Sequence, residues 1–330
     1  MSLKRAIVIT GLLLINTMIF SQDPHFSQFY ASPLYMAPSF AGASEKTRVT
    51  LNYRDQWPKI PGLFVTYSFA ADHYLNDLNS GLGVFFMRDD AGDGKISTTN
   101  VAGNYSYKLK ISDRWYFQPG LKFYYHQYQL DYSKVVFNDQ LGFDYTNPTS
   151  VEITEDEKVT YVDFGSSLMF YNHKYWIGGM VDHLIKANPS FQDNPNYKPL
   201  IYSLYGGLQI PLKKLNFNRS RNSLFAAFHF KSQQQIRQFN LGAYYQKEAF
   251  MVGLWYRGIP LIPKTPSNDA VILMLGYSSD NFSIGYSYDA TISRLITNTG
   301  GAHEISLSYT FSGEDLFNNQ EYTPPPCPQL

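Results

Sequence analysis

The chain has 330 residues with 27 basic and 27 acidic side chains, so its formal net charge is zero. Charged residues make up 16% of it and aromatic residues 17%, while the mean hydropathy is only -0.28. An ordinary soluble domain has about 25% charged residues. Neutral charge without a Lys/Arg run argues against nucleic-acid binding. The single cysteine, Cys327, excludes an intrachain disulfide and a cysteine-built zinc site.

Residues 1–21 have the pattern of a secretory signal peptide. Lys4 and Arg5 precede an uncharged, mostly apolar run that ends at Phe20, and the small residue Ser21 is suited to cleavage before Gln22. The apolar run is shorter than the roughly 20 residues that a membrane helix requires. We therefore expect the chain to leave the cytoplasm.

Residues 22–46 form an N-terminal segment that is nearly uncharged and shows no strand alternation. Its three prolines argue against a long helix, because proline removes a donor and clashes within a helix. The segment carries an aromatic set, namely Phe26, Phe29, Tyr30, Tyr35 and Phe40. Two alternatives are a free tail and a plug that buries these rings in the lumen of a barrel, and we favour the plug.

From residue 47 onwards, apolar and polar residues alternate with the period of two that is typical of strands with unlike faces. In residues 47–54, for example, Val49, Leu51 and Tyr53 alternate with Thr50, Asn52 and Arg54. About fourteen such segments begin near residues 47, 62, 80, 95, 114, 158, 174, 199, 222, 235, 248, 269, 281 and 302. The alternation predicts an all-β fold between residues 47 and 311.

The number of segments and the lengths of their connections predict a transmembrane antiparallel β-barrel of about 14 strands. Bacterial membrane barrels have an even number of strands, long extracellular loops and short periplasmic turns. Most long connections here are odd-numbered, as in 128–157, 183–198, 258–268 and 289–301, whereas 172–174 and 246–248 are tight turns. A barrel also leaves no unpaired sheet edge in lipid.

In such a barrel the apolar face contacts membrane lipid and the polar face lines the lumen. Aromatic pairs at strand ends are suited to interfacial girdles, namely Trp115-Tyr116, Tyr175-Trp176, Trp255-Tyr256 and Tyr286 with Tyr288. After Phe311, residues 312–330 form a Pro-rich tail that we expect in the periplasm, either bound to a partner or as a disordered extension.

Several motifs, in order along the chain, resemble one known family. Residues 23–42 read DPHFSQFYASPLYMAPSFAG, and Arg54 to Trp57 read RDQW. A GLG strand at residues 81–83 is followed by DDAG at 89–92, and Tyr288-Asp289 precedes GGAHEI at 300–305. Together these motifs resemble the PorP/SprF family of the Bacteroidota type IX secretion and gliding motility apparatus. One departure is Ala37-Pro38-Ser39, where that family more often has N-P-A.

The resemblance implies an outer-membrane accessory component of type IX secretion. It implies partners of two kinds: a secreted cargo or surface adhesin, held through its C-terminal domain for export or attachment, and the periplasmic ring of the machine. The loop 128–157 is our candidate docking surface, because aromatic anchors among acidic residues are suited to protein contacts. Its anchors are Phe137, Leu141, Phe143 and Tyr145. A loop that only covers the barrel mouth is the alternative.

No catalytic, cofactor or metal site is predicted. Histidines and serines are present, but no G-x-S-x-G elbow accompanies them, and Asp89–Gly94 lacks the closing Glu of a calcium loop. For His303-Glu304 we expect a lumen contact with Arg54 or Arg294 rather than catalysis. The alternative function is a channel for hydrophobic or other small solutes, because plugged barrels of fourteen strands also carry long-chain solutes.

Overall fold

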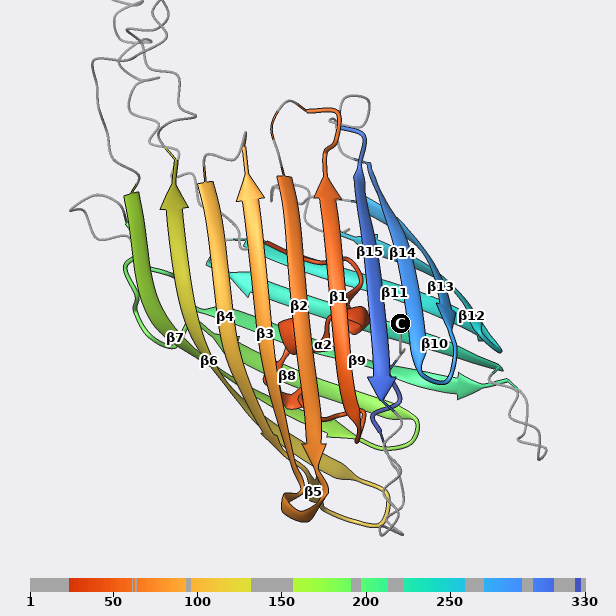
Figure 1. The fold of residues 1–330 in the computed structure, drawn as a ribbon. Helices are drawn as coiled ribbons and strands as arrows, with labels where there is room; N and C mark the ends of the chain where they lie inside the picture. The colour runs from red at the N-terminus through yellow and green to blue at the C-terminus, as the bar shows by residue number, and fades with distance from the viewer. Residues whose placement is uncertain are drawn as a thin grey trace, which may run out of the picture.

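The computed structural model describes residues 24–60, 62, 64–92, 96–131, 157–190, 197–212, 222–234, 236–258, 270–292, 299–311 and 324–327. In this part of the chain, antiparallel strands form a barrel wall around a short N-terminal segment (Figure 1).

Fourteen long strands form the wall. They are β1 (Thr47–Gln56), β2 (Phe64–Leu75), β3 (Ser80–Ala91), β4 (Ile96–Tyr107), β6 (Tyr116–Leu130), β7 (Glu157–Tyr171), β8 (Tyr175–Asp182), β9 (Ile201–Pro211), β10 (Asn222–Gln233), β11 (Ile236–Lys247), β12 (Phe250–Arg257), β13 (Ala270–Ser278), β14 (Phe282–Thr291) and β15 (Ala302–Phe311). A two-residue strand, β5 (Leu109–Lys110), pairs with β6 in the turn that follows β4.

The sheet is closed because its first and last long strands pair. β1 lies between β2 and β15, in a register that places Arg54 opposite Glu304. β4 pairs with β6 across the small excursion of β5. Every long strand is therefore hydrogen-bonded on both sides, as a backbone that crosses lipid requires. The predicted barrel of fourteen strands is confirmed, and each strand begins within two residues of its expected start.

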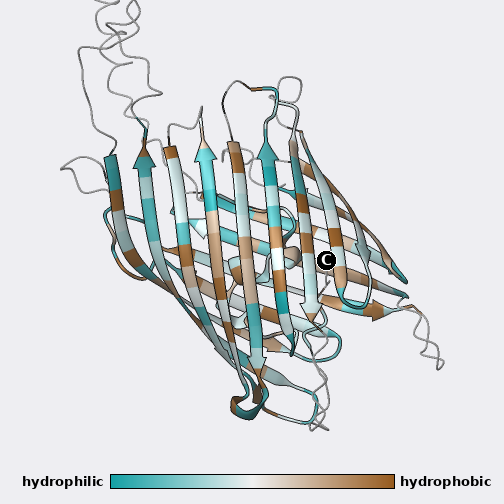
Figure 2. Ribbon diagram, viewed as in Figure 1, coloured by the Kyte–Doolittle hydropathy of each residue, from teal (hydrophilic) through white to brown (hydrophobic). Residues whose placement is uncertain are grey.

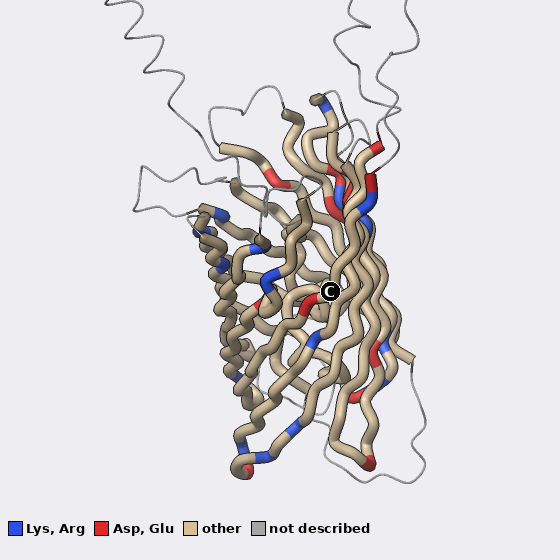
Figure 3. Tube along the Cα trace, turned by 90° about the vertical axis from the view of Figure 1, so that its left-hand side faces the viewer, with Lys and Arg blue, Asp and Glu red and all other residues tan. Residues whose placement is uncertain are grey.

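Hydrophilic and hydrophobic residues follow one another along the strands (Figure 2), and the two faces of the wall differ as the alternation predicts. Large apolar side chains project outward and stay exposed, among them Leu51, Val84, Leu121, Leu254 and Leu273, which are 47–59% exposed. Their chain neighbours point inward and are buried, as Asn52 and Ser106 are. Figure 3 shows charged residues set singly or in small groups among long uncharged stretches of the strands.

The predicted aromatic girdles are only partly correct. Tyr286 and Tyr288 are exposed on the outer face, and so is Tyr175. Trp176 and Trp255 instead point into the lumen and are almost fully buried. Neighbouring residues of a strand face opposite sides, so a pair of adjacent aromatics cannot both contact the membrane interface.

The connections differ in length between the two ends of the barrel. Most of the long connections, namely β6–β7, β8–β9, β12–β13 and β14–β15, join strands at the end where β1 finishes, the upper end in Figure 1, whereas the long connection β9–β10 joins strands at the opposite end. Tight turns such as 172–174 and 248–249 lie at the lower end. Within the described residues, no helix has the length and apolar character needed to cross a membrane.

Candidate functional site

The N-terminal segment, residues 24–46, lies inside the barrel (Figure 1). Every residue from Phe26 to Ser44 is buried except Tyr35, which is partly buried. The segment is a chain of short helical turns, namely η1 (Phe29–Ala31), α2 (Pro33–Met36) and η2 (Pro38–Phe40). Pro33 and Pro38 each occupy a first helical position, where the missing N–H costs nothing. The prolines thus divide the segment into compact pieces.

The five aromatic side chains expected in a plug all lie in the lumen. Phe29 packs against Trp255, with ring centroids 5.4 Å apart, and Tyr30 packs edge-on against Trp176. Phe40 contacts Tyr205 of β9. Phe26 and Tyr35 form a separate T-shaped pair beside Phe85. The segment therefore bridges strands from several sides of the barrel.

The backbone of the segment approaches the wall closely at glycine positions. A Cβ atom on Gly81 would lie 2.0 Å from the carbonyl oxygen of Ala41, and one on Gly120 would lie 2.3 Å from the Ser39 nitrogen. Such distances are shorter than any van der Waals contact, so only glycine fits. The Gly81-Leu82-Gly83 motif thus provides space for the segment, since a Cβ on Gly83 would lie 2.7 Å from the end of the Leu34 side chain.

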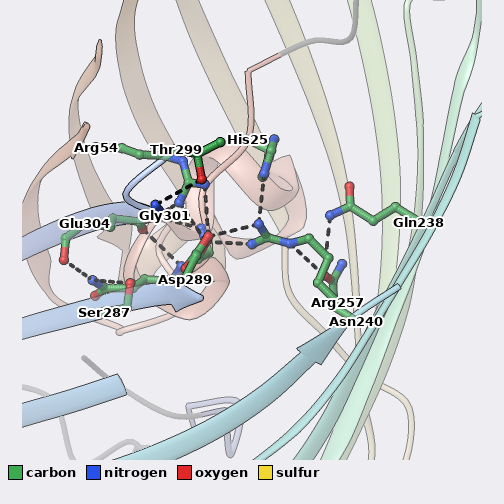
Figure 4. Close-up of polar contacts among 12 residues, drawn as sticks. His25, Arg54, Gln238, Asn240, Arg257, Ser287, Asp289, Thr299, Gly301 and Glu304 are labelled. Atoms are coloured by element: carbon green, nitrogen blue, oxygen red, sulfur yellow. Dashed lines mark hydrogen bonds and ion pairs between the residues drawn. The ribbon is translucent and has the colours of Figure 1, made fainter. Parts of the chain in front are cut away.

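A group of buried charges holds the start of the segment. The carboxylate of Glu304 accepts hydrogen bonds from the backbone nitrogens of Ser27 and Gln28, at 2.7 and 3.0 Å. Arg54 donates to Glu304 at 3.1 Å and to Asp289 at 2.9 Å. We call Arg54, Arg257, Asp289 and Glu304 the polar clamp (Figure 4).

Arg257 completes the polar clamp from β12. Its guanidinium donates to Asp289 at 2.9 Å, to the Ser27 hydroxyl at 2.6 Å and to His25 Nε2 at 3.1 Å. Burial, and then the positive charges of Arg257 and Arg54, lower the pKa of the His25 imidazole well below its usual value. His25 is therefore neutral and accepts this hydrogen bond. With two cations and two anions, the polar clamp is formally neutral.

The structure brings together some of the predicted lumen residues and separates others. Arg54 and Glu304 are cross-strand neighbours and form the expected contact. The lumen prediction for His303 is wrong, because it precedes the inward Glu304 on its strand and so lies on the outer face, bonded to Tyr286. Arg294 lies outside the described residues, as do the proposed docking residues Phe137, Leu141, Phe143 and Tyr145.

The polar clamp also contains residues that sequence reasoning missed. Asp289, and Ser27, which bonds to the polar clamp, stand within the quoted motifs, but the motifs alone indicate no role for the carboxylate or the hydroxyl. Arg257 follows the aromatic pair of β12. The sequence feature that points to it is an arginine at the end of an apolar strand. Residues from four distant motifs thus meet at one place in the lumen.

The described part of the C-terminal tail also lies in the lumen, where the sequence predicted a periplasmic position. Pro325 and Pro326 are buried, and Cys327 packs against the aromatic cluster of the N-terminal segment. A small cavity beside Cys327 is lined by Tyr30, Pro33 and Phe40. An apolar, proline-rich stretch loses little by leaving water for an aromatic surface. Burial raises the pKa of the Cys327 thiol to about 11.

The fold and its contents define a class: a closed antiparallel membrane barrel of fourteen strands whose lumen holds its own N-terminal segment. The sequence also assigns the chain to a family. Residues 19–309 match the family model for the type IX secretion system membrane protein PorP/SprF. The chain belongs to this family, and its barrel lies in the bacterial outer membrane. The family is one of secretion membrane proteins and not of enzymes. No curated protein matches this chain.

Solved structures share the fold at low sequence identity. A monoaromatic hydrocarbon channel, CymD, is 11% identical with a TM-score of 0.51, and the match covers 85% of this chain and 93% of that one. The toluene transporter TbuX of Ralstonia pickettii is 13% identical with a TM-score of 0.48, covering 85% and 94%. A FadL homologue from Pseudomonas aeruginosa is 14% identical with a TM-score of 0.45, covering the same shares. The first of these likenesses supports the barrel architecture alone.

Proposed function

We propose that this protein is an accessory barrel of type IX secretion that binds the C-terminal domain of a secreted cargo or adhesin and supports its export or surface attachment. Membership in the PorP/SprF family ties the chain to the secretion machinery. The observation that carries the proposal further is the occupied lumen. A segment fixed by the polar clamp and by tight glycine contacts suits a docking protein better than an open pore.

The space that remains in the lumen argues against the alternative, a channel for long solutes. The cavity above the N-terminal segment has a volume of about 80 Å³. A protein cavity of about 150 Å³ holds one benzene molecule. A long-chain solute would therefore have to displace residues 24–46, whose backbone is hydrogen-bonded to side chains of several strands, among them β2, β4, β7 and β15. We favour contacts at the two ends of the barrel over passage through it.

We propose that each end of the barrel binds a different partner. The connection between β6 and β7 carries Phe137, Leu141, Phe143 and Tyr145, which we propose as the anchors for cargo on the outer side. The tight turns at the opposite end are the surface that we assign to the periplasmic ring of the machine. Aromatic side chains at the centre of a protein contact commonly supply most of its binding energy.

Affinity isolation from detergent-solubilised outer membranes tests the proposal. Wild-type barrel should recover a secreted protein with a C-terminal secretion domain, together with secretion components. A Phe137→Ala, Phe143→Ala and Tyr145→Ala triple variant should recover the machine components but at least tenfold less cargo. The matched control is Tyr197→Ala, an exposed aromatic on the neighbouring connection. Recovery of neither cargo nor machinery by the wild type would overturn the proposal.

A further inference from the structure

A second group of buried polar side chains lies in the barrel wall, apart from the polar clamp. His126 of β6, Asp163 of β7 and His183, the first residue after β8, are each at most 4% exposed. One possible ligand atom from each residue lies within 4.8 Å of the other two. Three adjacent strands of the closed sheet thus bring two imidazoles and one carboxylate to one point.

Hydrogen bonds orient both imidazole rings. His126 Nδ1 contacts the Asn100 amide oxygen, and this oxygen can only accept, so Nδ1 carries the proton and Nε2 the lone pair. His183 Nδ1 faces Asp163 Oδ2 at 2.5 Å. The other oxygen of Asp163 accepts from the backbone nitrogens of Phe164 and Ile185, which fixes the carboxylate. A metal-binding histidine commonly donates its other ring N–H to an acceptor, as His126 does here, and a metal-binding carboxylate is commonly hydrogen-bonded, as Asp163 is.

We propose that His126, Asp163 and His183 bind one divalent transition-metal ion of the Zn²⁺ type. The ion would bind Asp163 Oδ2, His183 Nδ1 and His126 Nε2, and the first two atoms, which are 2.5 Å apart in the structure, would move apart to admit it. The His183 ring then carries its proton on Nε2, and the present Asp163–His183 hydrogen bond is replaced by two bonds to the ion. Two imidazoles and a carboxylate form a common ligand set for such ions, at bonds of about 2.0–2.2 Å.

A second carboxylate, Asp182, and the Lys122 ammonium lie beside the site, and the lumen cavity gives an ion access to it. Asp182 accepts a hydrogen bond from the His183 backbone nitrogen and contacts the Tyr124 hydroxyl. His126, Asp182 and His183 also line the lumen cavity above the N-terminal segment. An ion can therefore reach the site from the lumen without crossing the apolar outer face.

The position of His183 indicates what the ion would do. His183 has a left-handed backbone, with φ of 60°, and begins the connection from β8 to β9. A metal bond to His183 would fix the start of this long connection to β6 and β7. The site would therefore order the end of the barrel where the long connections lie.

Metal titration of the full-length barrel tests the proposal. The protein is purified in detergent with a histidine-free affinity tag, stripped with a chelator and titrated with Co²⁺ and Zn²⁺. We expect one ion per chain by calorimetry, a Co²⁺ absorption spectrum of mixed nitrogen and oxygen ligation, and a higher melting temperature with Zn²⁺.

Two variants and one control separate a specific site from surface binding. Asp163→Asn keeps the shape of the side chain, and His183→Asn suits the left-handed backbone, because Asn tolerates positive φ. Each should weaken binding at least tenfold and abolish the melting shift, while heat-modifiable migration in gels confirms the folded barrel. His173→Ala removes an exposed histidine on a turn and should change nothing. Absence of binding by the wild type, or unchanged affinity in folded His183→Asn, would overturn the proposal.

Discussion

The side chains of the polar clamp are buried charges that compensate one another. Glu304 is fully buried and serves three partners, namely Arg54 and the backbone nitrogens of Ser27 and Gln28. Removing one partner of a buried ion pair is costly, because the remaining charge stays desolvated. Each buried charge of the polar clamp is thus stabilised by the charges of the other clamp residues.

Glu304→Gln should lower the free energy of unfolding by about 3 kcal/mol, because Arg54 loses a charge partner and the segment loses its strongest acceptor. Urea unfolding in detergent, followed by tryptophan fluorescence, measures the change. Glu248→Gln is the matched control, because this glutamate is exposed on a tight turn and should change the free energy by less than about 0.5 kcal/mol. Equal effects of the two substitutions would contradict a stabilising role for the polar clamp.

The His25 side chain makes the binding of the N-terminal segment inside the lumen, which we call its seating, sensitive to pH. Its neutral ring accepts from Arg257, while Arg54, Lys231 and His229 also face it from β1 and β10, and the seated pKa is lowered. A displaced segment regains a pKa of about 6.5. Seating is therefore complete above this value and weakens as the pH falls below it, by at most about 1.4 kcal/mol per pH unit.

Protease cleavage of the segment at pH 8, 6 and 5 measures this dependence. Cleavage of the wild type should increase as the pH falls. His25→Gln retains a neutral acceptor for Arg257 and should show a smaller increase between pH 6.5 and 5. The other buried histidines are unchanged in this variant, so identical pH profiles would exclude His25 as the origin of the effect.

At the scale of elements, the N-terminal segment and the strands fit through the glycines of the wall. Gly81→Ala should push Ala41 away from β3 and lower stability by about 1–3 kcal/mol, as overpacking does. Gly103→Ala is the matched control, because Gly103 is on the next strand, faces outward and has no atom within 4 Å of an added Cβ. The urea midpoints of unfolding of the two variants measure this difference in stability. A Gly81→Ala midpoint equal to that of Gly103→Ala would refute the close fit.

Deleting residues 22–44 should raise the single-channel conductance of the barrel in planar bilayers, because the deletion empties the lumen of its buried aromatic set. The wild type should show little or no conductance. A deletion variant that folds, as judged by heat-modifiable migration, yet conducts no better than the wild type would rule out a plug.

At the scale of the whole molecule, the two ends of the chain meet inside the barrel. Cys327 contacts the N-terminal segment and carries a thiol with a raised pKa, so it should react slowly with a maleimide in the native state. We expect labelling to be at least tenfold faster when residues 22–44 are deleted. A cysteine placed by Leu78→Cys in a Cys327→Ala background serves as the exposed control. Equally fast labelling of Cys327 and this control would place the tail outside the lumen.

The barrel can largely be predicted from the sequence, because the alternation that produces each strand involves residues close together in the chain. Alternating residues such as Val49, Thr50 and Leu51 indicate the two faces of a strand, and the connections indicate where each strand begins and ends. The polar clamp was only half predictable. Arg54 and Glu304 stood out as charges on inward positions, whereas Asp289 and Arg257 lie on strands whose distance from β1 depends on the way the sheet closes.

The sequence by itself determined the strand number, the unlike faces and the family, since each depends on residues close together in the chain. Only the tertiary structure decided that motifs from residues 27, 54, 289 and 304 meet, that Trp176 and Trp255 face inward, and that both ends of the chain share the lumen. These outcomes depend on closure, which sets which distant strands become neighbours. The physical reason is that a barrel in lipid must pair its first strand with its last.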